Sequence, residues 1–296
     1  MPNRSVHGSA ATGLPAYPTD RVAPHLFFLV SAVFHYLGPA FAVLLFRSVD
    51  PLGVAWLRIA SAAAVFSIWR KPWRSCAQGG REQWLLVILL GTTLAAMNCV
   101  FYEAIDRLPL GTVGAIEFLG PIVLAAIGAR TGRNLAALAL ATAGALILAK
   151  ARIAGQLLGY VFAFANCALF MLYIVLGHRI ATRAGVGAID RLGAAMRVAT
   201  VAALPLGIGP AAPALTSPTL LGAAIGVGVS SSVIPYVCDQ FAMARLPRAT
   251  FALMLSLLPA MACAMGLAVL RQAPSAVEAG AIALVIVGVA LHRPNR

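Results

Sequence analysis

Long apolar segments separated by short polar connections are the dominant pattern along this chain. Each segment is close to the length of about 20 residues that a helix needs to cross the hydrocarbon core of a bilayer. The predicted helices cover residues 26–46, 51–69, 84–104, 111–130, 134–150, 156–177, 188–208, 219–241, 249–270 and 275–292. The pattern therefore predicts an all-α integral membrane protein with ten transmembrane helices, in which helices that follow one another pack as neighbours.

The first residues of the chain differ from the rest. Residues 1–24 are polar and rich in Pro, Gly, Ser and Thr. They lack the basic start, apolar stretch and cleavage site of a signal peptide. We expect a flexible cytoplasmic tail.

Composition supports the membrane interpretation. Of the 296 residues, 61% are hydrophobic and 10% are charged, and the mean hydropathy is +0.90. Soluble domains carry about 25% charged residues. A soluble globular enzyme is therefore excluded, and so is a disordered chain, because the apolar content is far too high.

The net charge of +13 reflects membrane orientation. Most Lys and Arg residues fall in the loops that lie on the same side as the N-terminus. Basic loops are retained on the cytoplasmic side of membrane proteins, so both termini are predicted to be cytoplasmic. Partners of this basic surface would be anionic lipid heads, and nucleic-acid binding is a poor interpretation.

The two halves of the sequence resemble each other at one offset. Residues 104–109 match 242–247, and Pro121 matches Pro259, both 138 positions apart. Residues 58–60 match 197–199 at an offset of 139. The repeat spans about five helices, an odd number, so the second copy enters the membrane inverted. We expect two five-helix repeats, over residues 25–153 and 154–292.

Inverted repeats are typical of secondary transporters. In these proteins the substrate binds near the midplane between the halves, and an exchange of their conformations gives alternating access. This organisation points to a carrier.

Several segments carry a resemblance to a known family. They are residues 97–102, 108–111, 234–236, 245–251 and the run Ile116-Glu117-Phe118-Leu119-Gly120-Pro121. In these segments the chain resembles the EamA-type, ten-helix branch of the drug/metabolite transporter superfamily, over residues 26–292. The resemblance implies two bundled repeats around a central cavity in a bacterial inner membrane. It also implies export of small amino acids such as threonine or homoserine, by antiport against protons.

The chain departs from the family pattern at two places. Leu258 stands where the family often has an acidic residue, and Leu270-Arg271-Gln272 stands where it often has Leu-Gly-Glu. Roles of those acids in binding or coupling do not transfer to this chain.

Ionisable side chains at membrane depth are costly and usually face a polar interior. Glu117 is the sharpest candidate, because it is predicted in mid-helix, four residues before Pro121. It could bind a substrate amine, carry a coupling proton, or do both in turn. The structural alternative is an ion pair with Arg58.

Arg58 and Arg197 occupy equivalent places in the two repeats. Either could meet a substrate carboxylate through a two-pronged contact. Either could instead pin helices together or extend to the membrane interface.

Further residues could complete the site. Asn98, Tyr102 and Tyr236 could shape the substrate pocket or simply pack between helices, and His35 could relay protons or serve as a hydrogen-bonded packing residue. Candidate hinges or helix breaks are the prolines Pro39, Pro121, Pro235 and Pro259, for which a kink without motion is the alternative.

The sequence lacks the motifs that are typical of enzymes and of ATP-driven pumps. The sequence contains no nucleophile elbow, His-Glu-x-x-His zinc pair or P-loop, so neither an enzyme nor an ATP-driven pump is favoured, and no cofactor or metal is expected. We interpret the five cysteines as packing residues. A proton-coupled exporter of amino acids is the leading hypothesis. The alternatives are an exporter of another metabolite or drug and, less favoured, a channel or a membrane enzyme.

Overall fold

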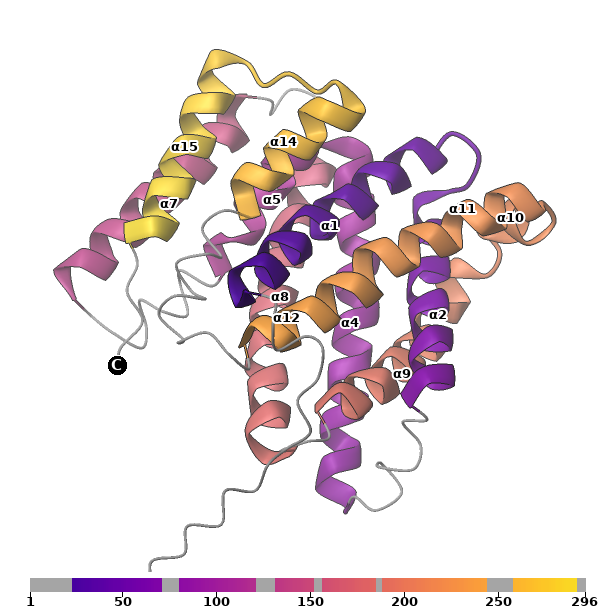
Figure 1. Ribbon diagram of the computed structural model, residues 1–296. Helices are drawn as coiled ribbons and strands as arrows, with labels where there is room; N and C mark the ends of the chain where they lie inside the picture. Colours follow the sequence, from indigo (N-terminus) through magenta and orange to yellow (C-terminus); the bar gives the residue numbers. More distant parts are fainter. Residues whose placement is uncertain are drawn as a thin grey trace, which may run out of the picture.

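The computed structural model describes residues 23–70, 80–120, 131–151, 156–184, 188–243 and 258–291. Within these ranges the regular structure is helical, without a strand. The elements in chain order are α1 (Pro24–Leu45), α2 (Pro51–Arg70), α4 (Arg81–Arg107), α5 (Leu110–Glu117), α7 (Gly132–Ala151), α8 (Leu157–Ala184), α9 (Ala188–Gly207), α10 (Ala212–Leu215), α11 (Pro218–Gly228), the π-helix η3 (Val229–Val233), α12 (Ile234–Met243), α14 (Leu258–Leu270) and α15 (Ala276–Leu291) (Figure 1).

Most of the predicted helices coincide with these elements where the chain is described. Residues 249–257, the start of the segment predicted over 249–270, lie outside the described part, and the short α10 was not predicted. The segment predicted over 111–130 begins as α5, but α5 ends at Glu117, and residues 121–130 lie outside the described part of the chain. The segment predicted over 219–241 is not a uniform α-helix, because the π-helix η3 joins α11 to α12.

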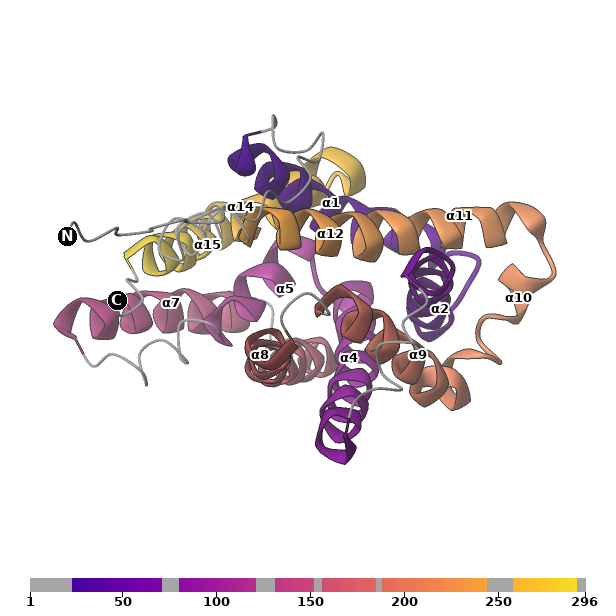
Figure 2. The same cartoon turned by 60° about the horizontal axis from the view of Figure 1, so that its bottom comes forward.

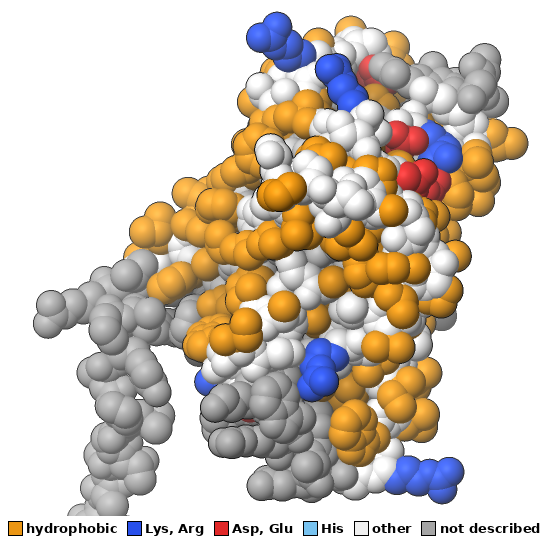
Figure 3. All heavy atoms as spheres, turned by 90° about the vertical axis from the view of Figure 1, so that its right-hand side faces the viewer, with side chains coloured by type: hydrophobic (Ala, Val, Ile, Leu, Met, Phe, Trp, Pro, Cys, Tyr) orange, Lys and Arg blue, Asp and Glu red, His pale blue; other side chains and the backbone are white. Residues whose placement is uncertain are grey.

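The helices have the length and composition of membrane-spanning segments. Five qualify by both criteria: His25–Leu45, Pro51–Arg70, Arg81–Arg107, Leu157–Gly177 and Pro218–Asp239. Shorter apolar helices cover Gly132–Ile147, Leu258–Leu270 and Ala276–Gly288. Figure 3 shows hydrophobic side chains covering the middle of one face, with charged side chains mostly toward its two ends. The chain is a multi-pass membrane protein, and the full set of ten spans stays a prediction.

Helix pairs from the two halves pack in a reciprocal pattern. Helix α4 of the first half packs against α8 of the second half, and α12 of the second half packs against α1 of the first half (Figures 1 and 2). When residue numbers are shifted by the repeat offset of 138, α4 corresponds to α11, η3 and α12, and α1 corresponds to α8. The contact of α4 with α8 is therefore equivalent to the contact of α12 with α1. The pairs α2 with α9 and α7 with α15 each join equivalent helices. The division at residues 153 and 154 itself stays a prediction.

The π-helix lies in close contact with α1 and α2. A Cβ at Gly38 would lie 2.8 Å from the Cα of Ser231, and a Cβ at Gly228 would overlap the side chain of Ser61 and approach the Arg58 carbonyl oxygen to 2.8 Å. Glycine at these two positions therefore lets the helices approach backbone to backbone. This approach brings the side chain of Arg58 to the π-helix.

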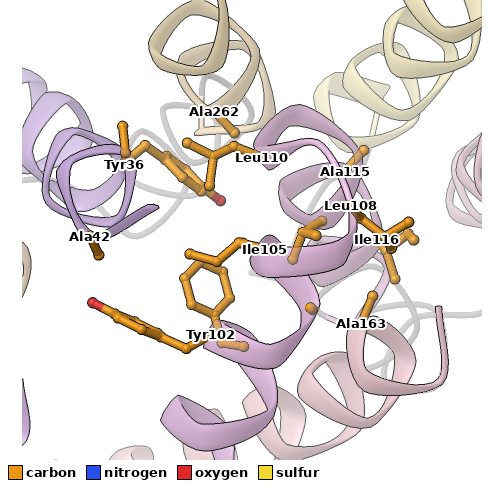
Figure 4. Packing of buried hydrophobic residues seen from close by; sticks show 14 of the residues in the cluster. Tyr36, Ala42, Tyr102, Ile105, Leu108, Leu110, Ala115, Ile116, Ala163 and Ala262 are labelled. Atoms are coloured by element: carbon orange, nitrogen blue, oxygen red, sulfur yellow. The ribbon is translucent and has the colours of Figure 1, made fainter. Parts of the chain in front are cut away.

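Two buried apolar clusters form the core. One joins α1, α4, α5, α14 and α15, and includes the fully buried Tyr36 and Tyr102. Figure 4 shows these tyrosines on α1 and α4, with their side chains directed into the space between the helices. The second cluster joins α2, α4 and α9. The polar residues described next lie within this otherwise apolar interior.

Candidate functional site

Glu117 is buried and hydrogen bonded by two neutral side chains. It is 4% exposed and lies at the last position of α5, not in mid-helix as predicted. The Tyr36 hydroxyl donates to its Oε2 at 3.2 Å, and Asn166 Nδ2 donates to its Oε1 at 3.2 Å. The chain makes a turn at Phe118, and helical backbone resumes at Leu119 and Gly120.

Arg58 is the buried cation of the same interior, at 7% exposure. Its Nε donates to Ser232 Oγ at 3.0 Å, and its two terminal nitrogens donate to Asn98 Oδ1 at 2.6 Å and to the Ser231 carbonyl oxygen at 3.0 Å. The Ser231 carbonyl lies four residues before Pro235, which has no N–H to offer it. The irregular backbone of η3 thus supplies acceptors for a charge inside the bilayer.

Tyr102 and Asn98 complete the surroundings of Arg58. The guanidinium carbon lies 5.5 Å from the centroid of the Tyr102 ring, within the range of a cation–π contact. The Tyr102 hydroxyl is buried without a hydrogen-bond partner in the described part of the chain. Asn98 is fixed in turn, because its Nδ2 donates to the Leu94 carbonyl at 2.8 Å. The structure therefore brings together three of the predicted site residues.

Glu117 and Arg58 do not form the ion pair that was the structural alternative for Glu117. Among the described residues, the ion pairs within 4 Å are Arg70 with Asp190 and Arg107 with Glu103 and Asp106. Glu117 and Arg58 are each stabilised by neutral dipoles and interact with one another only at longer range through the protein interior. Neither charge is neutralised by direct contact with the other.

The other predicted site residues lie at different positions. His35 is half-buried and packs edge-on against Tyr36, with ring centroids 5.2 Å apart. Tyr236 is half-buried on α12 and packs against the second apolar cluster. Arg197 is exposed on α9, so the equivalence with Arg58 that the repeat predicted does not bring it into the buried site. Arg197 can be exposed while Arg58 is buried, because α9 and α2 turn different faces toward the core.

The predicted prolines behave differently from one another. Pro39 lies inside α1, which continues to Leu45, so it is not a helix break. Pro235 is the second residue of α12, close to the end of the π-helix, where the hydrogen-bond pattern changes. Pro259 lies in α14, and the residues before Leu258 lie outside the described part of the chain. Pro121 lies outside the described residues.

Sequence reasoning named Asn98 but missed the other neutral partners of the two charges. These are Tyr36, Asn166, Ser231 and Ser232, all of them buried. A signal was available, because Asn166 interrupts an apolar run and polar residues in such runs usually face a polar interior. The serines lie in a Ser-Ser-Ser stretch just before Pro235.

A cavity of about 380 Å³ lies elsewhere, between the α4–α5 turn and the α14–α15 connection. Neither Glu117 nor Arg58 lines it. The central cavity that the resemblance implies stays a prediction. Metal binding finds no support in the described ranges, where no three His, Cys, Asp or Glu residues are grouped as ligands. Cys99, Cys167, Cys238 and Cys263 are free thiols, and Cys76 lies outside the described residues.

Comparisons with known proteins agree with this architecture. No protein-family model matches the chain. The threonine/homoserine exporter RhtA of Salmonella typhimurium strain SL1344 is 29% identical over 266 residues, which cover 89% of this chain and 88% of the relative. RhtA of Escherichia coli strain K12 is 29% identical over 255 residues, 84% of each chain. A crystal structure of another protein, 19% identical, covers 90% of this chain with a TM-score of 0.59 and shows similarity of fold alone.

Proposed function

We propose that this chain, a RhtA-like member of the drug/metabolite transporter superfamily, exports small amino acids such as threonine and homoserine across a bacterial inner membrane, coupled to protons. The observation that carries the proposal is a buried carboxylate and a buried guanidinium, each bonded by neutral groups and not by one another. The curated relatives are named as exporters and not as enzymes.

The two separate charges of Glu117 and Arg58 suit a zwitterionic substrate. A free amino acid carries an ammonium and a carboxylate, and Arg binds carboxylates in a planar, two-pronged geometry. The guanidinium of Arg58 would exchange Asn98 and the Ser231 carbonyl for the substrate carboxylate. Glu117 would exchange Tyr36 or Asn166 for the substrate ammonium. Because the protein itself supplies hydrogen-bond partners for both side chains, their hydrogen-bonding capacity is satisfied in the absence of substrate.

Proton coupling would use the same carboxyl group. Glu117 can hold either the substrate ammonium as a carboxylate or a proton as a neutral acid. Competition between the two for one group would make export of the substrate depend on entry of a proton. Tyr36 can stay bonded to Glu117 in both forms, because its hydroxyl is both donor and acceptor.

Alternating access would use the reciprocal packing of the two halves. The contact of α4 with α8 is equivalent to that of α12 with α1, so exchanging the two conformations would open the site to one side and then to the other. Arg58 bonds α2 to η3 in the second half, and Glu117 bonds α5 to α8. Both charges therefore lie at contacts between the halves, where binding can affect their relative position.

Counterflow in liposomes tests the proposal. The purified chain is reconstituted, and exchange of labelled threonine and homoserine is measured with and without an imposed pH gradient. Glu117→Gln preserves the size and hydrogen bonding of the side chain but removes its charge. Glu82→Gln makes the same change at an exposed position at the start of α4 and serves as the matched control.

We expect saturable, gradient-dependent exchange in the wild type and in Glu82→Gln, and loss of the gradient response in Glu117→Gln. Gradient-dependent exchange that survives in Glu117→Gln would remove Glu117 from proton coupling. Flux without saturation or counterflow would point to a channel. No flux of either amino acid would reject this substrate assignment in favour of another metabolite or drug, and conversion of the substrate would indicate an enzyme.

A further inference from the structure

The cavity near the α4–α5 turn has a wall of mixed polar and apolar side chains and carries charges of both signs. Its wall includes Asp106, Arg107, Arg271 and Glu278, two acids and two bases. Apolar side chains such as Val43 complete it. Its volume of about 380 Å³ falls within the range of small-molecule sites, which is about 300–1,000 Å³. The cavity reaches the surface, because Asp106 and Arg271 are exposed.

We propose that this cavity is a second binding site, distinct from Glu117 and Arg58, that takes a free α-amino acid in its zwitterionic form. The choice of an amino acid rests on the proposed function, whereas the requirement for both charges rests on the cavity itself. A wall that is neutral overall but carries both signs favours a ligand with separated charges over a simple anion or cation. In the proposed orientation the cavity opens to the outer side, where an exported molecule is released.

Arg271 is the residue that would bind the carboxylate. It adopts a left-handed backbone conformation, with φ of 55°, directly after the end of α14. Glycine is the usual residue at such a helix end, because a side chain is strained there. Strained residues that persist are concentrated at functional sites. The Arg271 guanidinium makes no hydrogen bond or ion pair with any residue that the structure describes, so its donors are available to a ligand.

The other charged residues of the wall indicate which carboxylate would bind the ligand ammonium. Arg107 is already bonded to the carbonyl and Oε2 of Glu103, at 2.7 and 2.6 Å. Glu278 is buried, and its Oε2 accepts from Ser275. Asp106 is more exposed, and its Oδ2 lies 3.6 Å from Arg107, beyond hydrogen-bond distance. Asp106 is therefore the carboxylate with free acceptor capacity, and it would receive the ammonium.

The cavity also contacts the helix that ends at Glu117. Gln272, in its wall, accepts a hydrogen bond from the Leu110 N–H at the start of α5, at 3.0 Å. Because α5 is only eight residues long, its two ends connect the cavity wall directly to the buried carboxyl group. A ligand in the cavity lies against the element that would move when Glu117 changes its partner.

Cys263 gives a reporter for occupancy, because it lines the cavity as a partly buried free thiol. The full-length chain is treated with a membrane-impermeant maleimide, and modification of Cys263 is followed by peptide mass spectrometry. We expect L-homoserine to slow this modification in a saturable manner. The single-charge probes n-butyrate and n-butylamine should give no such protection. Ala273→Cys, at an exposed position of the wall, provides the same reading if Cys263 reacts too slowly.

The decisive variant is Arg271→Gly. It removes the guanidinium and suits the left-handed backbone, so it should fold at least as well as the wild type. We expect the homoserine concentration needed for protection to rise about tenfold or more, the effect of losing a charge-assisted contact. Arg47→Gly removes an exposed arginine that does not line the cavity and should leave protection unchanged. Glu117→Gln should also retain protection.

The outcomes separate the two proposals. Three results would overturn the proposal of a second site. They are protection that persists in Arg271→Gly, protection by the single-charge probes, and no protection at either reporter. Loss of protection in Glu117→Gln would also overturn it, because the reporter would then follow occupancy of the buried site. Counterflow without protection would leave the proposed transport intact. Protection without counterflow of any amino acid would leave the second site intact and reject transport.

Discussion

Tyr36 on α1 donates its hydroxyl to Glu117 at the end of α5, across 3.2 Å of an otherwise apolar interior. A buried carboxyl group needs such donors, because burial removes it from bulk water. Asn166 on α8 provides the second donor, so Glu117 joins three helices from both halves of the chain.

Tyr36→Phe should separate the structural part of this contact from the functional part. The change removes only the hydroxyl, and we expect the free energy of unfolding to fall by about 1–3 kcal/mol. We expect counterflow to survive with an altered pH profile, because Glu117 is still present but has lost one partner. The measurements are thermal unfolding in detergent and counterflow as a function of pH. Tyr160→Phe, a buried tyrosine outside this contact, is the comparison. An unchanged pH profile would show that Tyr36 does not influence the transport step.

Arg58→Lys should be strongly deleterious although it keeps the charge. The guanidinium satisfies Asn98, Ser232 and the Ser231 carbonyl at once, and an ammonium cannot reproduce this planar arrangement. Loss of one or two charge-assisted hydrogen bonds predicts a destabilisation of about 2–4 kcal/mol. Thermal unfolding measures this loss, and the apparent KM of counterflow should rise if Arg58 binds the substrate carboxylate.

The exposed Arg47→Lys, in the turn between α1 and α2, is the control for Arg58→Lys and should change neither quantity. A stable Arg58→Lys variant with a normal KM would reject both the structural and the substrate role. A destabilised variant with a normal KM would leave Arg58 with a structural role alone.

The sequence predicted most of the described helices, the two buried charges and two neighbours of Arg58, Asn98 and Tyr102, but it missed the other side chains around those charges. Apolar runs fix where helices form, and the cost of a charge in the membrane singles out Glu117 and Arg58. The partners Tyr36 and Asn166 depend on how helices rotate against each other, which periodicity does not determine. Arg197 illustrates the limit, because sequence equivalence with Arg58 did not predict which face of α9 it occupies.

Local backbone irregularity was equally hard to predict. Pro39 and Pro235 both lie inside apolar runs, yet α1 continues through the first, whereas a π-helix precedes the second. The difference depends on neighbours. Arg58 and Ser31 bond to carbonyl oxygens around Pro235, and such contacts become visible only in three dimensions.

Gly228→Ala should disturb the approach of η3 to α2. Its added methyl would overlap Ser61 and lie 2.8 Å from the Arg58 carbonyl oxygen, which is backbone and cannot simply rotate away. Overpacking of this kind costs about 1–3 kcal/mol. Gly226→Ala, two residues earlier on α11, meets no atom within 4 Å and should be neutral or stabilising by up to about 1 kcal/mol. Thermal unfolding of both variants checks the contrast, and equal stabilities would contradict the close helix contact.

Gln272 tests whether the α14–α15 connection holds α5 in place. Its Oε1 accepts from the Leu110 N–H, one of the donors that a helix start leaves without an intrahelical partner. Gln272→Ala should cost about 1 kcal/mol, as the loss of a helix cap does. Gln272→Glu keeps an acceptor and adds a negative charge near the helix N-terminus, where it is favourable, so it should retain stability. If α5 is coupled to the buried site, Gln272→Ala should also raise counterflow KM, and Gln272→Glu should not. Equal behaviour of the two variants would show that this hydrogen bond contributes nothing to the position of α5.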